Sequence, residues 1–172
     1  MAAAALAVAA AAAVRIPFLV VRDEDGNEAA CFPLAGRQAS FSIGYMHSVA
    51  KLPSEEFFTR GPGGSILLIK TVYKGLGAGL PFDSEGGRVS LQEGAIVIEG
   101  LKRSFESITV IPLPFTEHRL TVGGRSLDLM TLLGGHSRAV LAIEPRSLPA
   151  SALYSLKNLI GDCRGKRGTG SP

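Results

Sequence analysis

The chain has little of what several protein classes require. Among its 172 residues there is no tryptophan, aromatic residues make up 6%, and charged residues make up 19%. The two cysteines form no CxxC motif, which excludes thiolate zinc sites and thioredoxin-like redox motifs. Hydrophobic residues make up 46%, and the glycines follow no three-residue period, which excludes wholly disordered and collagen-like chains. A globular domain remains, long enough to form a core without metal or disulfide.

The cysteines and the charges are both unevenly placed. Cys31 lies in an apolar stretch and Cys163 in a polar C-terminal tail, so we favour a buried Cys31 and a free thiol on Cys163, with pairing left open. Residues 1–150 contain 14 basic and 14 acidic side chains, whereas residues 151–172 contain four basic and one acidic. The net charge of +3 therefore comes from the tail. A protein that binds nucleic acid needs a basic stripe on its folded body, so nucleic acid is not expected as a partner.

The sequence also lacks an apolar run long enough to span a bilayer. Ala2–Val14 contains 13 apolar residues, and Arg15 and Pro17 interrupt the apolar stretch after it. A membrane span needs about 20 such residues, whereas this length is typical of the apolar part of a signal peptide. Residues 1–15 are therefore interpreted as a leader or signal-like segment, with a disordered Ala-rich extension as the alternative. The leader interpretation predicts an extracytoplasmic protein, secreted or held at the membrane through this segment.

Short apolar stretches alternate with turn residues over most of the chain. Asp23–Asn27 separates two strands of a predicted hairpin, and Gly61–Gly64 separates those of another. The first half is predicted to contain strands at Phe18–Arg22, Glu28–Leu34, Phe41–Val49, Glu55–Arg60 and Ser65–Tyr73. The second half is predicted to contain strands at Val89–Leu91, Ala95–Glu99, Ser107–Ile111, His118–Val122, Ser126–Leu132 and Arg138–Ile143.

Strands about ten residues apart, joined by glycine turns, favour one architecture. The predicted fold is all-β and mainly antiparallel, a β-sandwich or a partly closed barrel with one short C-terminal helix. Leucines and isoleucine at helical spacing after Pro149 place that helix at residues 149–161. The β-rich domain then covers residues 16–148, and residues 162–172 are predicted to be a disordered basic tail.

The densest group of chemically active side chains lies between Tyr45 and Phe57. Alternate residues of a strand share a face, so Tyr45 and His47 are expected to point one way and Ser48 the other. Ser48 and His47 could not then form a nucleophile–base pair, and no catalytic residue is predicted.

A polar network is predicted in the same stretch. Pro53 is expected to end the strand and turn the chain, so that Glu55 or Glu56 returns beside Tyr45 and His47. Such a Tyr-His-Glu network is either a structural hydrogen-bond cluster or a site for a ligand or partner. The sequence leaves both interpretations open.

Metal and nucleotide sites are not predicted. The three histidines, His47, His118 and His136, show no HxH or HExxH spacing. The glycine-rich segment 75–81 has neither GxGxxG spacing nor a Gly-Lys-Ser/Thr ending. Its glycines instead favour a tight crossing or a close approach to a partner. No cofactor is expected.

Four motifs together resemble a known family. They are Leu19–Asp23, Phe41–Glu56 with its Tyr-x-His-Ser-Val-x-Lys-x-Pro-x-Glu-Glu core, Gly77–Pro81, and His118–Leu120 before a Gly-Gly turn. Over roughly residues 18–145 the chain resembles domain of unknown function 1850. Members of that family typically occur beside the membrane subunits of TRAP-type solute transporters of the TAXI subfamily, and no reaction is established for them.

The resemblance implies a non-enzymatic, extracytoplasmic accessory or binding domain of such a transporter. Its expected partners are the membrane subunits or the solute-binding protein of that system. The predicted binding residues are Tyr45, His47, Ser48, Lys51, Glu55, Glu56, Gly77, Gly79, Pro81 and His118. The alternatives are a small hydrolase or metal-dependent enzyme that uses the His and Glu residues, and a purely structural subunit that holds a partner through an edge strand.

Overall fold

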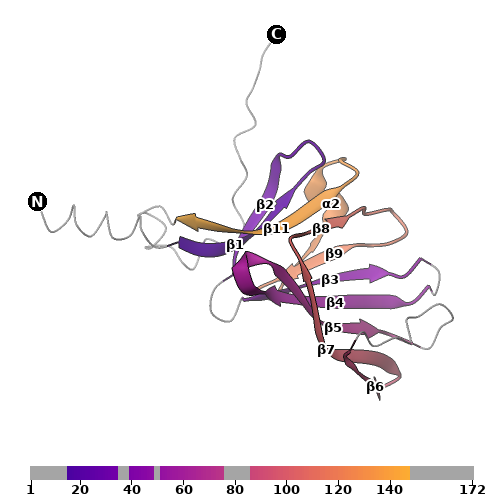
Figure 1. The fold of residues 1–172 in the computed structure, drawn as a ribbon. Helices are drawn as coiled ribbons and strands as arrows, with labels where there is room; N and C mark the ends of the chain where they lie inside the picture. The colour runs from indigo at the N-terminus through magenta and orange to yellow at the C-terminus, as the bar shows by residue number, and fades with distance from the viewer. Residues whose placement is uncertain (1–14, 35–38, 49–50, 76–85, 148–172) are drawn as a thin grey trace, which may run out of the picture.

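A computed structural model describes residues 15–34, 39–48, 51–75 and 86–147. Within this part of the chain, eleven strands form two antiparallel sheets (Figure 1). Sheet A has the order β2(Glu28–Pro33), β1(Arg15–Arg22), β11(Ala139–Ser147), β8(Ser107–Val110). Sheet B has the order β10(Arg125–Asp128), β9(Arg119–Val122), β3(Ser40–Met46), β4(Pro53–Arg60), β5(Ile66–Tyr73), β7(Ala95–Phe105), β6(Arg88–Gln92). The all-β, mainly antiparallel prediction is confirmed, as two sheets without closure into a barrel.

The two sheets pack face to face around one apolar core. In β3, Phe41 and Ile43 point into the core, and the ring of Phe41 stacks on Phe58 of β4 with centroids 5.1 Å apart. Sheet A contributes Leu19 and Leu141, both fully buried. Burying a side chain of this size stabilises the folded state by about 1.5–3 kcal/mol, so the alternating pattern fixes which face of each strand is internal.

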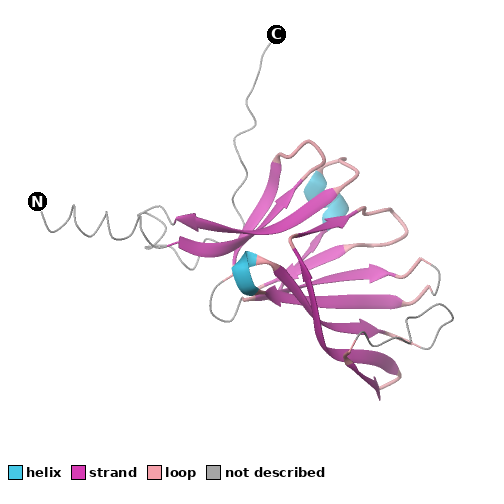
Figure 2. Ribbon diagram, in the orientation of Figure 1, coloured by secondary structure: helices cyan, strands magenta, loops and turns pink. Residues whose placement is uncertain are grey.

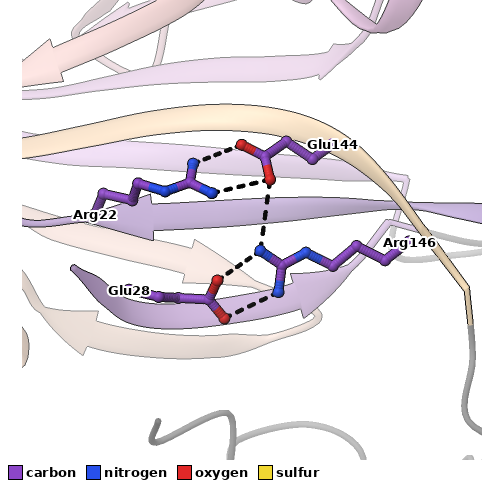
Figure 3. A network of polar contacts seen from close by, with 4 residues as sticks. All are labelled: Arg22, Glu28, Glu144 and Arg146. Atoms are coloured by element: carbon purple, nitrogen blue, oxygen red, sulfur yellow. Dashed lines mark hydrogen bonds and ion pairs between the residues drawn. The ribbon is translucent and has the colours of Figure 1, made fainter. Parts of the chain in front are cut away.

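The outer face of sheet A carries a smaller apolar cluster and a group of four charged residues. Phe18, Val20 and Cys31 are buried there. Figure 3 shows two arginines and two glutamates reaching toward one another from three strands of this sheet. The four residues are Arg22, Glu28, Glu144 and Arg146, and we call them the charge lattice.

Glu144 is the centre of the charge lattice. Its two oxygens accept hydrogen bonds from the guanidinium of Arg22 at 2.5 and 3.0 Å, and one of them lies 3.5 Å from Arg146. Arg146 is also bidentate to Glu28, at 3.0 and 2.5 Å. The hydrogen bond from Arg22 lowers the pKa of Glu144, and the same contact raises the pKa of Arg22. The lattice ties β1, β2 and β11 together.

Cys31 has a different covalent state from the reduced, buried residue that the sequence favours. It is 2% exposed, as expected for an apolar position, but it is disulfide-bonded, so its thiol is not free. The other cysteine of the chain, Cys163, lies outside the described residues.

The chain crosses from sheet B to sheet A through one long strand. The predicted strand Ala95–Glu99 continues to Phe105, because Gly100 adopts a φ of 78° and absorbs a register shift against β5. After Glu106 the chain enters β8, which pairs with β11. The long strand therefore carries Arg103 to the seam where the two sheets meet.

Two other predicted elements end differently. The predicted strand Ser126–Leu132 stops at Asp128, whose carboxylate accepts the Thr131 amide at 2.8 Å and caps the short helix α2(Leu129–Leu133). Gly134 then ends that helix with a φ of 62°. Figure 2 shows how little helix the described residues contain. The helix predicted at 149–161, the leader and the basic tail lie outside the described residues.

The strand predicted to run from Phe41 to Val49 ends at Met46. His47 and Ser48 instead belong to a turn, in which the His47 amide donates to Leu52 and the His47 carbonyl accepts from Lys51. Lys51 has a φ of 53°. Pro53 does not end a strand. It is the first residue of β4, opposite Met46, a position where proline is tolerated because the sheet does not need a backbone N–H there. The expectation that His47 and Ser48 point to opposite faces of one strand therefore does not apply, because neither residue lies in a strand.

Candidate functional site

Polar side chains occupy one end of the inner face of sheet B. Register places Tyr45 of β3 opposite Ser54 of β4, and Ser54 opposite Tyr73 of β5. One step further into the core, Glu56 lies between Ile43 and Thr71. Because partners across strands share a face, a carboxylate and a phenol here point toward the core rather than to solvent. We call Tyr45, Glu56, Thr116 and His118 the inner polar cluster.

Glu56 and Tyr45 form the central pair of this cluster. The Tyr45 hydroxyl donates to Glu56 Oε1 at 3.2 Å, and both side chains are half-buried. Burial raises the pKa of Glu56, against the opposing effects of the Tyr45 hydrogen bond and the positive charge of Arg103. Burial and the nearby carboxylate also raise the pKa of Tyr45 well above its usual range. The phenol therefore stays protonated at neutral pH and serves as a donor.

His118 is held beside this pair by a ring contact and a hydroxyl. Its imidazole stacks on Tyr45 with centroids 5.6 Å apart, and its Nδ1 lies 2.7 Å from Thr116 Oγ1. The same hydroxyl accepts from the Leu113 amide at 2.9 Å and donates to the Leu113 carbonyl at 2.8 Å, and the Thr116 carbonyl accepts from Met46. Burial lowers the pKa of His118, so the imidazole is neutral at neutral pH.

A cavity opens beside the cluster, at the seam between β4, β5, β7 and β8. It has a volume of about 300 Å³, and Glu56 and Arg103 contribute ionisable groups to its lining. Apolar walls come from Phe58, Leu68, Phe105 and Ile108. The Arg103 guanidinium lies over the Phe105 ring at 5.1 Å, which fixes its place at the cavity. A carboxylate, a guanidinium and apolar walls therefore surround one space.

The predicted binding residues fall into separate groups. As expected, a glutamate returns beside Tyr45, and it is Glu56. Glu55 lies on the outer face, where it accepts the Ser42 hydroxyl at 2.7 Å. The His47 ring meets the edge of Tyr73, with centroids 6.4 Å apart, whereas the imidazole stacked on Tyr45 belongs to His118.

The remaining predicted residues lie at the tip of the domain or beyond the described part of the chain. Ser48 is exposed, and Lys51 lies over the Phe115 ring at 5.7 Å. Gly77, Gly79 and Pro81 lie outside the described residues.

Two members of this region were missed in the sequence. Thr116 and Arg103 belong to stretches whose polar residues look like those of any solvated strand or loop. Arg103 reaches this region through the register of β7 against β5. Thr116 reaches it through a turn in which its amide donates to the Leu113 carbonyl. A weak signal existed for Thr116, since a threonine three residues after Leu113 in a proline-containing loop suits a side-chain turn.

The three histidines have different surroundings. His136 lies 3.5–3.7 Å from the carboxylates of Asp23, Glu24 and Asp25 in the β1–β2 turn, away from the ring contacts made by His47 and His118. Among residues 15–34, 39–48, 51–75 and 86–147, no group of three or more His, Cys, Asp or Glu is arranged to hold a metal ion. No helix in these ranges is long and apolar enough to cross a membrane.

The scaffold and cluster define a two-sheet β domain with an ionisable site on its inner face. Residues 41–129 match the family model described as Domain of unknown function (DUF1850), more than half of the chain. The chain belongs to this family. The matched range includes the whole inner polar cluster and Arg103. Neither a curated protein nor a solved structure matches the chain.

Proposed function

We propose that this chain is an extracytoplasmic accessory binding domain of a TAXI-type TRAP solute transporter, and that its inner polar cluster is the working site. The observation that carries the proposal is Glu56, a carboxyl turned inward where burial disfavours its charge. Groups held against a desolvation cost cluster at functional sites. The family match supports the motif resemblance, and the transporter context is what that resemblance implies.

The cluster is better suited to binding than to covalent chemistry. The raised pKa of Tyr45 makes its phenol a hydrogen-bond donor rather than a nucleophile. The lowered pKa of His118 keeps its imidazole neutral, and both rings are fixed by stacking. Fixed donors, acceptors and rings in a partly apolar setting are the usual elements of a recognition site. The enzyme alternative would require metal or turnover in the purified protein, which metal analysis and an esterase screen would detect.

The disulfide at Cys31 supports the proposed location outside the cytoplasm. Disulfides persist outside the reducing cytosol, and Cys31 is disulfide-bonded. Mass measurement of the N-terminus after expression in a native-like host tests the location. A chain trimmed within residues 1–15 agrees with export, whereas an untrimmed chain found in the cytosol contradicts the proposal.

The site itself is tested with Tyr45→Phe and His118→Ala, followed by circular dichroism and by uptake through the neighbouring transporter. His136→Ala is the matched control, because its imidazole contacts the β1–β2 turn instead. Lost uptake with intact folding supports the binding function. Lost folding supports a structural role, and unchanged uptake with unchanged folding defeats the proposal.

A second candidate function, a structural subunit that pairs through an edge strand, is favoured by β6. This strand ends sheet B and exposes Val89 and Leu91, with 49% and 65% of their surface accessible. An exposed edge with apolar side chains is a template for strand addition. Leu91→Lys should then abolish co-purification with the membrane subunit, while Tyr45→Phe leaves it intact. The reverse pattern supports the inner polar cluster instead.

A further inference from the structure

The outer face of sheet A is deeply buried although it points away from the core between the sheets. Phe18, Val20 and Cys31 form a separate apolar cluster on this face, with 4%, 0% and 2% of their surface exposed. The charge lattice shares the face, but its side chains keep 25–34% of their surface accessible. Because a sheet face with buried apolar side chains needs a second layer to pack on, something must cover this cluster.

The covalent state of Cys31 indicates what that layer is. Cys31 is disulfide-bonded, and it lies in the same cluster as Phe18 and Val20, so its sulfur is on the outer face. The sequence contains one other cysteine, Cys163, which is therefore the partner that the same chain offers. A disulfide holds the two Cα atoms about 4.4–6.8 Å apart. A bond between these cysteines would bring the C-terminal segment against β2.

The chain after β11 has the right length to lie along this face. β11 ends at Ser147, opposite Arg15 at the start of β1. Cys31 pairs with Val20, five residues further along β1 and one strand beyond it. With about 3.4 Å per residue along a strand and about 4.8 Å between strands, Ser147 and Cys31 are about 20 Å apart. The helix predicted at residues 149–161 spans about 20 Å at 1.5 Å per residue, so it can run back to Cys31.

The same segment has an apolar side in its sequence. Leu156, Leu159 and Ile160 precede Cys163 by seven, four and three residues. These spacings place the three apolar residues on one side of a helix, and the chain then leads directly to Cys163. An apolar side with no place in the described core thus meets an apolar face that needs a cover.

We propose that residues 149–163, which we call the cover segment, pack on the outer face of sheet A and are held there by a disulfide between Cys163 and Cys31. The bond forms when the two thiols transfer two electrons and two protons to a protein disulfide, whose own sulfurs become thiols. It persists outside the reducing cytosol, so the cover segment is locked in an oxidising compartment and released by reduction. This interface goes beyond the proposed function and does not rest on it, because it shares no residue with the inner polar cluster.

Peptide mapping of the purified full chain without reductant tests the bond. Trypsin should release residues 23–37 and 158–164 as one linked pair, which dithiothreitol separates into two thiol peptides as it is itself oxidised to a disulfide. Two linked copies of residues 23–37 would show that a second chain occupies this face. Unlinked thiol peptides would show that the bond is absent. Either of these results overturns the proposal.

Amide hydrogen exchange tests whether the cover segment packs on the sheet. An isolated helix of this length is marginal in water, so its amides are protected only where it packs against the domain. In the oxidised full chain, amides of residues 152–162 should exchange at least about tenfold more slowly than those of residues 165–172, which lie beyond the bond. Equal exchange in the two ranges with the bond intact would show a tether without packing, and would overturn the proposal.

Two matched double variants locate the packed side. Leu156→Asp with Leu159→Asp should remove the protection while the disulfide remains, because carboxylates buried against an apolar face incur a large desolvation cost. Ser151→Asp with Asn158→Asp adds the same charge on the polar side of the predicted helix and should leave the protection unchanged. Equal effects of the two double variants would contradict the proposed packing.

Cys163→Ser removes the bond without changing any residue of the two sheets. It should lower the unfolding midpoint by about 5–15 °C, because the disulfide closes a loop of most of the chain, and it should speed amide exchange in the cover segment. The same release should follow when dithiothreitol is added to the wild-type chain. An unchanged midpoint and unchanged exchange in Cys163→Ser would overturn the proposal, whereas uptake through the transporter would still test the inner polar cluster independently.

Discussion

Replacing Glu56 with glutamine should stabilise the protein at neutral pH. The carboxyl lies on the inner face, and burial raises its pKa more than the Tyr45 hydroxyl and Arg103 lower it. Each unit by which a folded-state pKa exceeds the unfolded-state value is equivalent to about 1.4 kcal/mol when the group is charged. Glutamine resembles the protonated acid but has an amide that also needs a partner. We therefore expect a net gain of about 1 kcal/mol, or about 4 °C in the unfolding midpoint for a domain of this size.

The pH dependence provides the sharper check. Because the folded-state pKa of Glu56 is raised, wild type incurs no penalty below the unfolded-state pKa and an increasing penalty as pH rises through the folded-state pKa. Thermal unfolding followed by circular dichroism should show the stability advantage of Glu56→Gln at pH 7 and its loss near pH 4. A glutamine variant that is less stable than wild type at pH 7, or an advantage independent of pH, would refute the assignment of a buried, disfavoured charge.

Three further predictions concern the charge lattice, the inner polar cluster and the disulfide of Cys31. Glu144→Gln should lower the free energy of unfolding by about 1 kcal/mol in low salt and by less in high salt, because its partners are partly exposed. Because the pKa of Glu144 is lowered in the folded state, its contribution to stability is present above the unfolded-state pKa and is lost as pH falls through the folded-state pKa. Equal urea midpoints for wild type and Glu144→Gln at every pH and salt concentration would contradict this prediction. Thr116→Val should cost about 0.5–1.5 kcal/mol, because it removes the hydroxyl that accepts from the Leu113 amide at 2.9 Å. The NMR signals of the His118 ring should also broaden, and sharp, unshifted signals would show that Thr116 does not hold the ring. Cys31 should resist alkylation in denaturant until a reductant is added, and modification of Cys31 without reductant would show that its thiol is free.

The architecture could be predicted because apolar alternation and turn chemistry agree along most of the chain. The Gly61–Gly64 turn and the β4–β5 hairpin are expected directly from a Gly-Pro-Gly-Gly sequence between two apolar stretches. The helix α2 could not be predicted by the same approach. Its apolar residues continue the pattern of β10, and only the cap at Asp128 and the glycine at 134 decide in favour of a helix.

The site could be predicted only in part. The pairing of Tyr45 with a returning glutamate is expected from a strand and turn, but which glutamate faces inward depends on the register between β3 and β4. A strand ending at Met46 rather than Val49 left His47 in the turn, and so His118 occupies the place expected for it beside Tyr45. Arg103 reaches the cavity through a bulge at Gly100 and a long strand, a non-local arrangement that periodicity cannot indicate.

Uptake measured in cells that carry Glu56→Gln in place of the wild-type chain tests most directly whether Glu56 is retained for function rather than for stability. The variant should accumulate to at least the wild-type level, unfold at a higher temperature at pH 7, and fail to support uptake through the adjacent transporter. Full uptake by cells with the stabilised variant would show that the inward carboxylate is dispensable and that the inner polar cluster is not the working site.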